Sequence, residues 1–143
     1  MTLLPPAMPL APPHAQPLRS YAQHLGIEAP RAASQARLDL RVDDRYRLRL
    51  LALPDGGVMI RARLMALPQG ANERDALAAR IGHLACGMMK HHASTCVIDA
   101  QARSLWLQQT TAGTSAHDID DAVGQFVNAL AFWAQATATP LSK

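Results

Sequence analysis

Between residues 37 and 65 aliphatic residues alternate with charged ones, mostly arginine, and this pattern constrains the fold more than any other feature. Successive side chains of a β-strand point to opposite faces of a sheet, so a period of two indicates strands with one apolar and one polar face. We expect strands over residues 37–42, 45–50 and 58–65. Pro54-Asp55-Gly56-Gly57 separates the last two, and Asp-Gly readily adopts the positive φ of a tight hairpin turn. The sequence therefore predicts an antiparallel meander with one apolar and one arginine-rich face.

Helical periodicity flanks these strands. Apolar residues recur at helical spacing from Leu18 to Leu25, and Gly26 is placed to end a short first helix. We expect Asn72 to cap a second helix and Ser115 a third, which carries Asp118 three residues on as in a capping box. Residues 94–99 and 103–110 form a second hairpin between these helices. The predicted fold is α+β, with the order α-β-β-β-α-β-β-α and helices packed on one face of a twisted antiparallel sheet.

The length of 143 residues fits one domain. Residues 1–17 contain six prolines and suit a flexible, extended N-terminal tail, with a proline-rich ligand for a partner domain as the alternative. We expect a single α+β domain over residues 18–137 and a C-terminal tail over residues 138–143.

Cysteine usage and the N-terminus favour a reducing cytoplasm. Cys86 and Cys96 are the only cysteines, their spacing matches no zinc pattern, and we interpret both as small buried hydrophobic residues. The proline-interrupted N-terminus does not resemble a secretory signal. No apolar run approaches the roughly 20 residues that span a membrane, so we expect no membrane insertion.

The sequence offers no set of residues for catalysis. Asp118, Asp120 and Asp121 stand in the first turn of a predicted helix, where carboxylates are favoured on electrostatic grounds alone. His83 and Cys86 have the spacing of two metal ligands, but a third and a fourth are missing, and adjacent His91 and His92 point in different directions. We therefore predict no catalytic, cofactor-binding or metal-binding residues, and a chain that is not an enzyme.

The second predicted helix is apolar on more than one side. Beside its main stripe, small or flexible residues recur along a second line, Ala78, Gly82, Ala85 and Met89. A helix that covers a sheet buries only one face, so this second line indicates a homodimer, in which small residues let another backbone approach closely. The alternative is that these residues are neutral on a solvated face.

The arginine rows suggest another surface. Arg47 and Arg49 on one strand, with Arg45 before them, are expected on the same sheet face as Arg61 and Arg63. Like charges directly opposite one another destabilise a sheet, so acidic groups from this chain or a partner would relieve the repulsion. Clustered arginine also fits nucleic acid, although no aromatic residue is interleaved here for base stacking. A solvated outer face is the third interpretation.

Several local patterns together resemble the class I chaperones of bacterial type III secretion. The similarity covers about residues 18 to 136 and includes the element order and the length. Its most specific parts are the run from Tyr46-Arg47-Leu48 through the Pro54–Gly57 turn to Val58–Leu67, the helix after Asn72, Leu105-Trp106-Leu107, and a last helix with Phe126, Leu130 and Trp133.

This resemblance implies a cytoplasmic homodimer of a Gram-negative bacterium that binds the N-terminal segment of one or more effector proteins. The segment would be held in extended form and kept soluble and export-competent without ATP, with the secretion ATPase or export apparatus as a further partner. The chain departs from the family in its basic isoelectric point of about 9.3, where members are commonly acidic, and in its long N-terminal extension. The implied effector-binding residues are Leu18, Tyr21, Leu25, Leu38, Leu40, Val42, Arg47, Arg49, Arg61 and Arg63, and the implied dimer interface is Ala78, Gly82, Ala85, Cys86, Met89, Cys96 and Ile98.

Two other functions remain open at this point. One is a nucleic-acid-binding module that uses the arginine-rich face, which would show binding that weakens steeply with salt. The other is a structural subunit of a larger assembly, which would form no dimer of its own.

Overall fold

The computed structural model describes residues 15–26, 36–88, 93–112 and 115–138. Its elements follow the predicted order, and the α+β prediction is confirmed. Five antiparallel strands form one sheet with the spatial order β1-β2-β3-β5-β4. The elements are α1 (Gln16–His24), β1 (Arg37–Val42), β2 (Tyr46–Ala52), β3 (Val58–Ala66), α2 (Ala71–Met88), β4 (Thr95–Asp99), β5 (Ser104–Thr111) and α3 (Ala116–Ala138).

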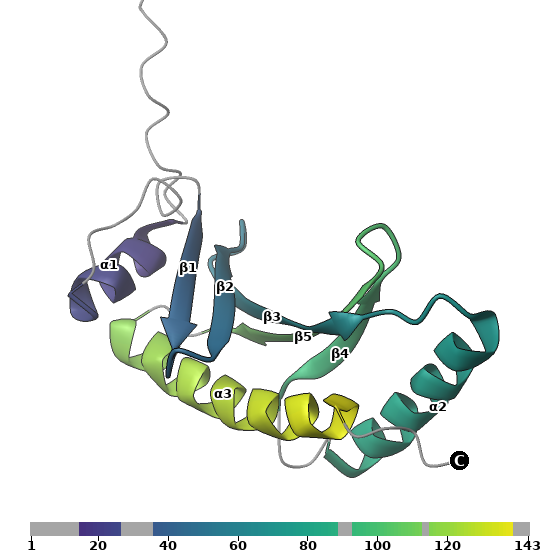
Figure 1. The fold of residues 1–143 in the computed structure, drawn as a ribbon. Helices are drawn as coiled ribbons and strands as arrows, with labels where there is room; N and C mark the ends of the chain where they lie inside the picture. The colour runs from purple at the N-terminus through teal and green to yellow at the C-terminus, as the bar shows by residue number, and fades with distance from the viewer. Residues whose placement is uncertain (1–14, 27–35, 89–92, 113–114, 139–143) are drawn as a thin grey trace, which may run out of the picture.

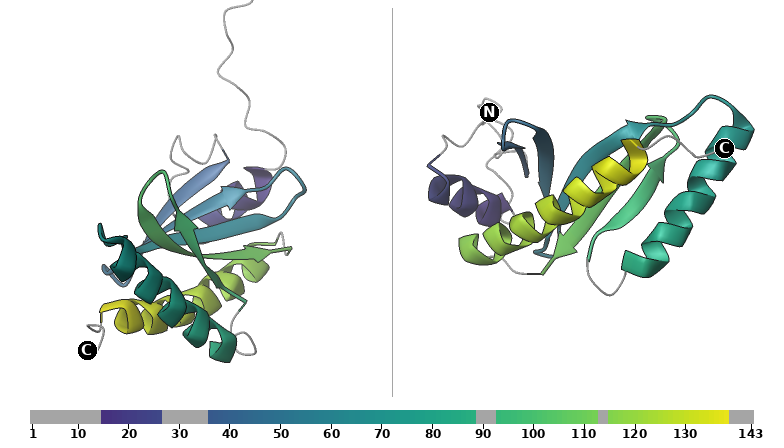
Figure 2. Two further views of the ribbon diagram at one scale, coloured as in Figure 1. Left: turned by 90° about the vertical axis from the view of Figure 1, so that its right-hand side faces the viewer. Right: turned by 60° about the horizontal axis from the view of Figure 1, so that its bottom comes forward.

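The three helices lie on one side of the sheet. Helix α3 runs along this side beneath the strands, while α1 lies beside β1 and α2 beside β4, at the two ends of the sheet (Figures 1 and 2). No helix of the described ranges covers the opposite face (Figure 2). The sheet therefore has a helix side and an outer side, as the alternating sequence predicts.

The core fills the space between the helix side of the sheet and α3. Alternate strand residues, such as Leu38, Leu48 and Ile60, are at most 1% exposed. From α3, Phe126 and Trp133 pack into the same core cluster. Full burial of one such side chain stabilises the fold by about 1.5–3 kcal/mol, so this layer accounts for the position of α3.

The hairpin turns have the backbone that their residues favour. Asp43 and Asp44, in the three-residue loop between β1 and β2, have φ of 54° and 53°, the left-handed region that a tight turn needs, and the N–H of Arg45 closes this turn by donating to the carbonyl of Val42 over 3.1 Å. In the next turn Gly56 has a φ of 100°. The backbone N–H of Gly57 donates to the Asp55 carboxylate over 3.0 Å, which confirms the predicted turn.

Two helix starts differ from the prediction. Helix α1 begins at Gln16 rather than Leu18, because Pro17 fits a first helical turn, where its missing N–H costs nothing. The cap predicted at Asn72 is wrong: the N–H of Arg74 donates to the carbonyl of Gly70 over 3.0 Å, so α2 has already begun at Ala71. At α3 the Ser115 hydroxyl accepts the N–H of Asp118 over 3.0 Å, as expected of an N-cap.

Residues 1–14 of the predicted N-terminal tail and residues 139–143 of the predicted C-terminal tail lie outside the described residues. Within the described ranges, no helix combines the length and apolar character needed to cross a bilayer.

Candidate binding surfaces

An apolar groove of about 330 Å³ lies between α2 and β4, and we call it the α2–β4 groove. Of residues 71–87 in α2, only Leu77 and Ile81 are buried, so most of this helix is open to solvent. Ile98 of β4 is 52% exposed although it is a large hydrophobic residue. The structure thus brings five of the predicted dimer residues to one groove: Ala78, Gly82, Ala85, Cys96 and Ile98.

The remaining two predicted dimer residues are placed differently. Cys86 is exposed on α2 but does not line the groove, and Met89 lies outside the described residues. The prediction that Cys86 is buried is therefore wrong, because α2 packs on the sheet along only one narrow stripe. Cys96 is half-buried, and burial raises the pKa of its thiol to about 12, which keeps it protonated and unreactive at neutral pH.

The described ranges contain no group of three or more His, Cys, Asp or Glu side chains that could hold a metal ion. His91 and His92, considered above as ligands, lie outside these ranges.

A second candidate surface lies where α1 adjoins β1. Among the strands that the structure describes, β1 lies at an edge of the sheet and pairs with β2 alone. Leu25, just after α1, is 40% exposed, and Val42 at the end of β1 is half-buried. The other predicted effector-binding residues of this region, Leu18, Tyr21, Leu38 and Leu40, are at most 8% exposed and belong to the core.

Tyr21 also ties α1 to α3 through a contact that no sequence pattern predicts. Its hydroxyl donates to the carboxylate of Asp120 over 3.0 Å. Burial, reinforced by the bond to and the charge of Asp120, raises the pKa of Tyr21 well above its usual value, so the hydroxyl stays protonated. No local pattern links these residues, which are 99 positions apart.

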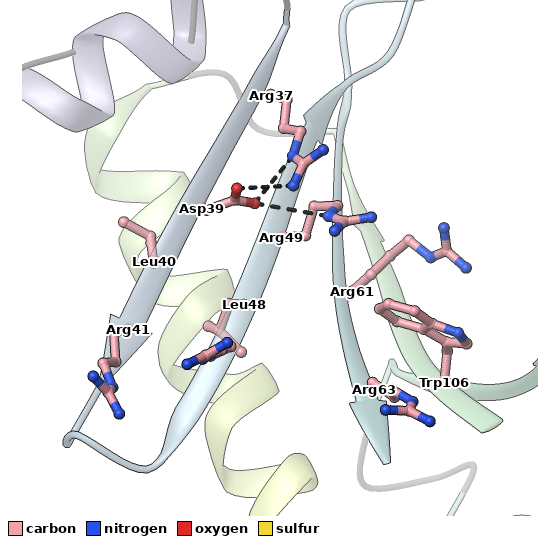
Figure 3. Close-up of a pocket in the computed structure, with 10 residues that line it drawn as sticks. Arg37, Asp39, Leu40, Arg41, Leu48, Arg49, Arg61, Arg63 and Trp106 are labelled. Carbon is pink, nitrogen blue, oxygen red and sulfur yellow. Dashed lines mark hydrogen bonds and ion pairs between the residues drawn. The ribbon is translucent and has the colours of Figure 1, made fainter. Parts of the chain in front are cut away.

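The third surface is on the outer side of the sheet, and we call it the arginine face. The side chains surround a hollow of about 460 Å³ (Figure 3). In the strand register Arg41 lies opposite Arg47, and Arg49 lies opposite Arg61, which places like charges directly across from one another. The polar and aromatic residues of the arginine face are Arg37, Asp39, Arg41, Arg47, Arg49, Arg61, Arg63 and Trp106.

Arg45, predicted on the same face, does not line this hollow. It precedes β2, and its guanidinium carbon lies 5.5 Å from the centre of the Tyr46 ring. The four arginines predicted to bind an effector, Arg47, Arg49, Arg61 and Arg63, all line it.

One carboxylate and one indole contact these arginines. Asp39 forms ion pairs with Arg37 at 2.9 Å and with Arg49 at 3.7 Å (Figure 3). The guanidinium carbon of Arg61 lies 4.7 Å from the centre of the Trp106 ring, and that of Arg49 lies 5.8 Å from it. The expectation that no aromatic residue stands among the arginines is therefore wrong, because β5 brings Trp106 beside β3 from more than 40 positions away.

Comparison with known proteins identifies the family of this fold. The family model of the Tir chaperone protein (CesT) family matches residues 16–134. A comparison with the sequences of curated proteins finds no match.

Three solved structures show the same fold at low sequence identity. A chain of the ExsC–ExsE complex has a TM-score of 0.64 and 13% identity, with 90% of this chain and 96% of that chain covered. A chain of the HopA1–SchA chaperone–effector complex has a TM-score of 0.61 and 10% identity, over 84% of this chain and 91% of that chain. A chain of the heterodimeric ExoU–SpcU complex from the type III secretion system of Pseudomonas aeruginosa has a TM-score of 0.60 and 13% identity, over 80% and 93%.

These likenesses are to the fold alone, while the family match spans most of the chain and confirms the resemblance to type III secretion chaperones drawn from the sequence. The chain belongs to the Tir chaperone protein (CesT) family.

Proposed function

We propose that this chain is a type III secretion chaperone that acts in the cytoplasm of a Gram-negative bacterium. It binds the N-terminal segment of a secreted effector in extended form and keeps it soluble and export-competent without ATP. The observation that carries this proposal is the family match over residues 16–134. The fold supports it, because two of the similar structures are complexes described as chaperone–effector or as part of a type III secretion system. Neither the family nor these structures favours the nucleic-acid alternative.

The edge formed by β1 is where we propose that the client segment docks. In the described part of the chain β1 pairs with β2 alone, so its outer backbone groups are open to an added strand. Val42 is half-buried at the end of β1, and Leu25 is 40% exposed just after the neighbouring helix α1, so both offer apolar surface that a bound segment would cover. The buried residues Leu18, Tyr21, Leu38 and Leu40 would act from within, by holding α1 against the sheet.

The α2–β4 groove is where we propose that a second copy of the chain docks. Ala78 and Gly82 are small and exposed, so the backbone of another helix can come close to α2. Ile98 exposes half of its surface beside them, and a second copy that packs on the groove would bury this apolar surface. Because this groove and the β1 edge lie at opposite ends of the sheet, dimerisation leaves the docking edge free (Figure 1).

The test is to recover the tagged chain from a bacterium that carries a type III secretion system and to identify bound proteins by mass spectrometry. We expect a secreted effector, bound through its N-terminal segment. Leu25→Glu should reduce its recovery several-fold, because a charge replaces exposed apolar surface just after α1, the helix that adjoins β1. Gln23→Glu, a change at an exposed position two residues earlier in α1, is the matched control and should recover the effector like the wild type. Failure to recover any secreted protein would contradict the proposal.

A further inference from the structure

We propose that the arginine face binds an acidic segment of the client polypeptide, whose carboxylates sit between arginine side chains that have no carboxylate partner among the described residues. This inference rests on the proposed function, and it adds the chemistry that the client must present.

The charge balance of the face is the first argument. Six arginines and one aspartate surround the hollow. Within the described ranges Arg41, Arg47 and Arg61 form no ion pair with a carboxylate. Opposed like charges destabilise a sheet, so the pairs Arg41–Arg47 and Arg49–Arg61 favour any occupant that brings negative charge.

Asp39 shows how a carboxylate fits here. It lies on β1 and bridges Arg37 on its own strand and Arg49 on the neighbouring strand (Figure 3). No residue of the described chain does the same for Arg41 and Arg47, which face each other on the same two strands. A carboxylate from a bound segment would complete this second site, since guanidinium groups bind carboxylates through strong, charge-assisted hydrogen bonds.

Two unpaired donors add an argument that does not depend on net charge. The Nε atom of Arg61 and the indole Nε1 atom of Trp106 are buried, and neither has a hydrogen-bond partner among the described residues. Arg63, in contrast, donates from its Nε atom to the Ser104 hydroxyl over 3.0 Å. Leaving buried donors without acceptors is unfavourable, so an occupant that brings an acceptor to these donors gains more here than on an ordinary surface.

The surroundings favour a polypeptide over a nucleic acid. Arg61 already lies over the ring of Trp106, so a base could stack there only by displacing that guanidinium. Of the described residues that line the hollow, Trp106 is also the one that is aromatic. The face is continuous with the proposed docking edge, since β1 contributes Arg37 and Arg41 to it. A client segment that leaves this edge therefore reaches the arginine face directly.

The experiment measures binding by fluorescence anisotropy with three labelled probes of equal length. The probes are a peptide of alternating glutamate and serine, the same peptide with glutamine for glutamate, and oligothymidylate. We expect the full chain to bind the glutamate peptide at least tenfold more tightly than either other probe. The double variant Arg47→Glu/Arg61→Glu should lose that affinity at least tenfold. The control Arg19→Glu/Arg103→Glu makes the same charge change away from the hollow and should stay within about twofold of wild type.

Three results would overturn the proposal: no preference for glutamate over glutamine, equal losses in both double variants, or stronger binding of oligothymidylate. The last would assign the face to nucleic acid. If circular dichroism shows that Arg47→Glu/Arg61→Glu is unfolded, the neutral Arg47→Gln replaces it, with Arg19→Gln as its control and at least a threefold loss expected.

Failure of this inference differs from failure of the proposed function. If a recovered effector binds the arginine variants and the wild type equally, the arginine face is not used and the chaperone function stands. If the glutamate peptide binds but no effector is recovered, the face binds acidic chains and the proposed function fails.

Discussion

Tyr21 shows how one hydroxyl anchors an element. It is 1% exposed and donates to Asp120, an exposed residue of α3. Tyr21→Phe removes the bond but leaves Asp120 accessible to water, so we expect a loss of about 1 kcal/mol in the free energy of unfolding. Urea denaturation at neutral pH measures this loss. Tyr46→Phe is the control, since its hydroxyl has no hydrogen-bond partner among the described residues, and an equal loss there would contradict the assignment.

The same pair predicts a pH dependence. The raised pKa of Tyr21 means that the folded chain keeps this proton at a pH where the unfolded chain loses it. The resulting stability is fully present below the ordinary tyrosine pKa of about 10 and is lost as pH rises above it. The advantage of the wild type over Tyr21→Phe should therefore shrink in urea titrations above about pH 10. An advantage that grows with pH would show that Tyr21 ionises more readily in the folded chain.

Replacing Asp39 should strengthen the binding of the glutamate peptide, whereas most substitutions in a binding surface weaken binding. It is the one carboxylate among the described residues that line the arginine face, and it forms ion pairs with Arg37 and Arg49. Asp39→Asn frees both arginines, so the glutamate peptide should bind several-fold more tightly, with the largest gain at low salt. Asp55→Asn, which removes the same charge from the β2–β3 turn, is the control. Anisotropy that shows weaker binding by Asp39→Asn would contradict the charge balance described here.

At the scale of elements, two glycines of α2 provide a test of whether the proposed dimer forms through this helix. A Cβ added at Gly82 or at Gly87 meets nothing within 4 Å in a single chain, and alanine favours a helix over glycine by up to about 1 kcal/mol. Only Gly82 lines the α2–β4 groove. We therefore expect Gly82→Ala to raise the dimer dissociation constant several-fold in sedimentation equilibrium, and Gly87→Ala to leave it within about twofold. Tighter association of Gly82→Ala would show that another surface forms the dimer.

The elements themselves could be predicted from the sequence because each has a local signal. The alternation of Leu48 and Leu50 with arginine, the Asp55-Gly56 turn and the Ser115 cap all act within a few residues. The cap at Asn72 was predicted wrongly, since Gly70 provides the first helical carbonyl in its place.

Long-range pairing explains what else escaped prediction. Trp106 reaches Arg61 only through the pairing of β3 with β5, whose register shifts between Arg63 and Met65. The exposure of Cys86 likewise depends on how little of α2 the sheet covers. The sequence therefore predicts which residue types share the arginine face, but it does not predict which of these residues contact one another.

At the scale of the whole molecule, helices on one side of the sheet leave three surfaces in different places. The β1 edge and the α2–β4 groove lie at opposite ends, and the arginine face spans the strands between them on the outer side (Figures 1 and 3). A dimer through the groove would present two β1 edges and two arginine faces. Such an arrangement suits a long extended segment, which gains affinity by occupying several modest sites at once.

The central claim is that a dimer of this chain holds an effector segment. The most direct measurement is the mass, by light scattering at high salt, of the complex recovered with its effector. We predict two copies of the 15.4 kDa chain with one effector, stable because apolar contacts and backbone pairing hold it together. A monomer of the chain without an effector, or a complex that high salt dissolves into nucleic acid and free protein, would contradict the claim.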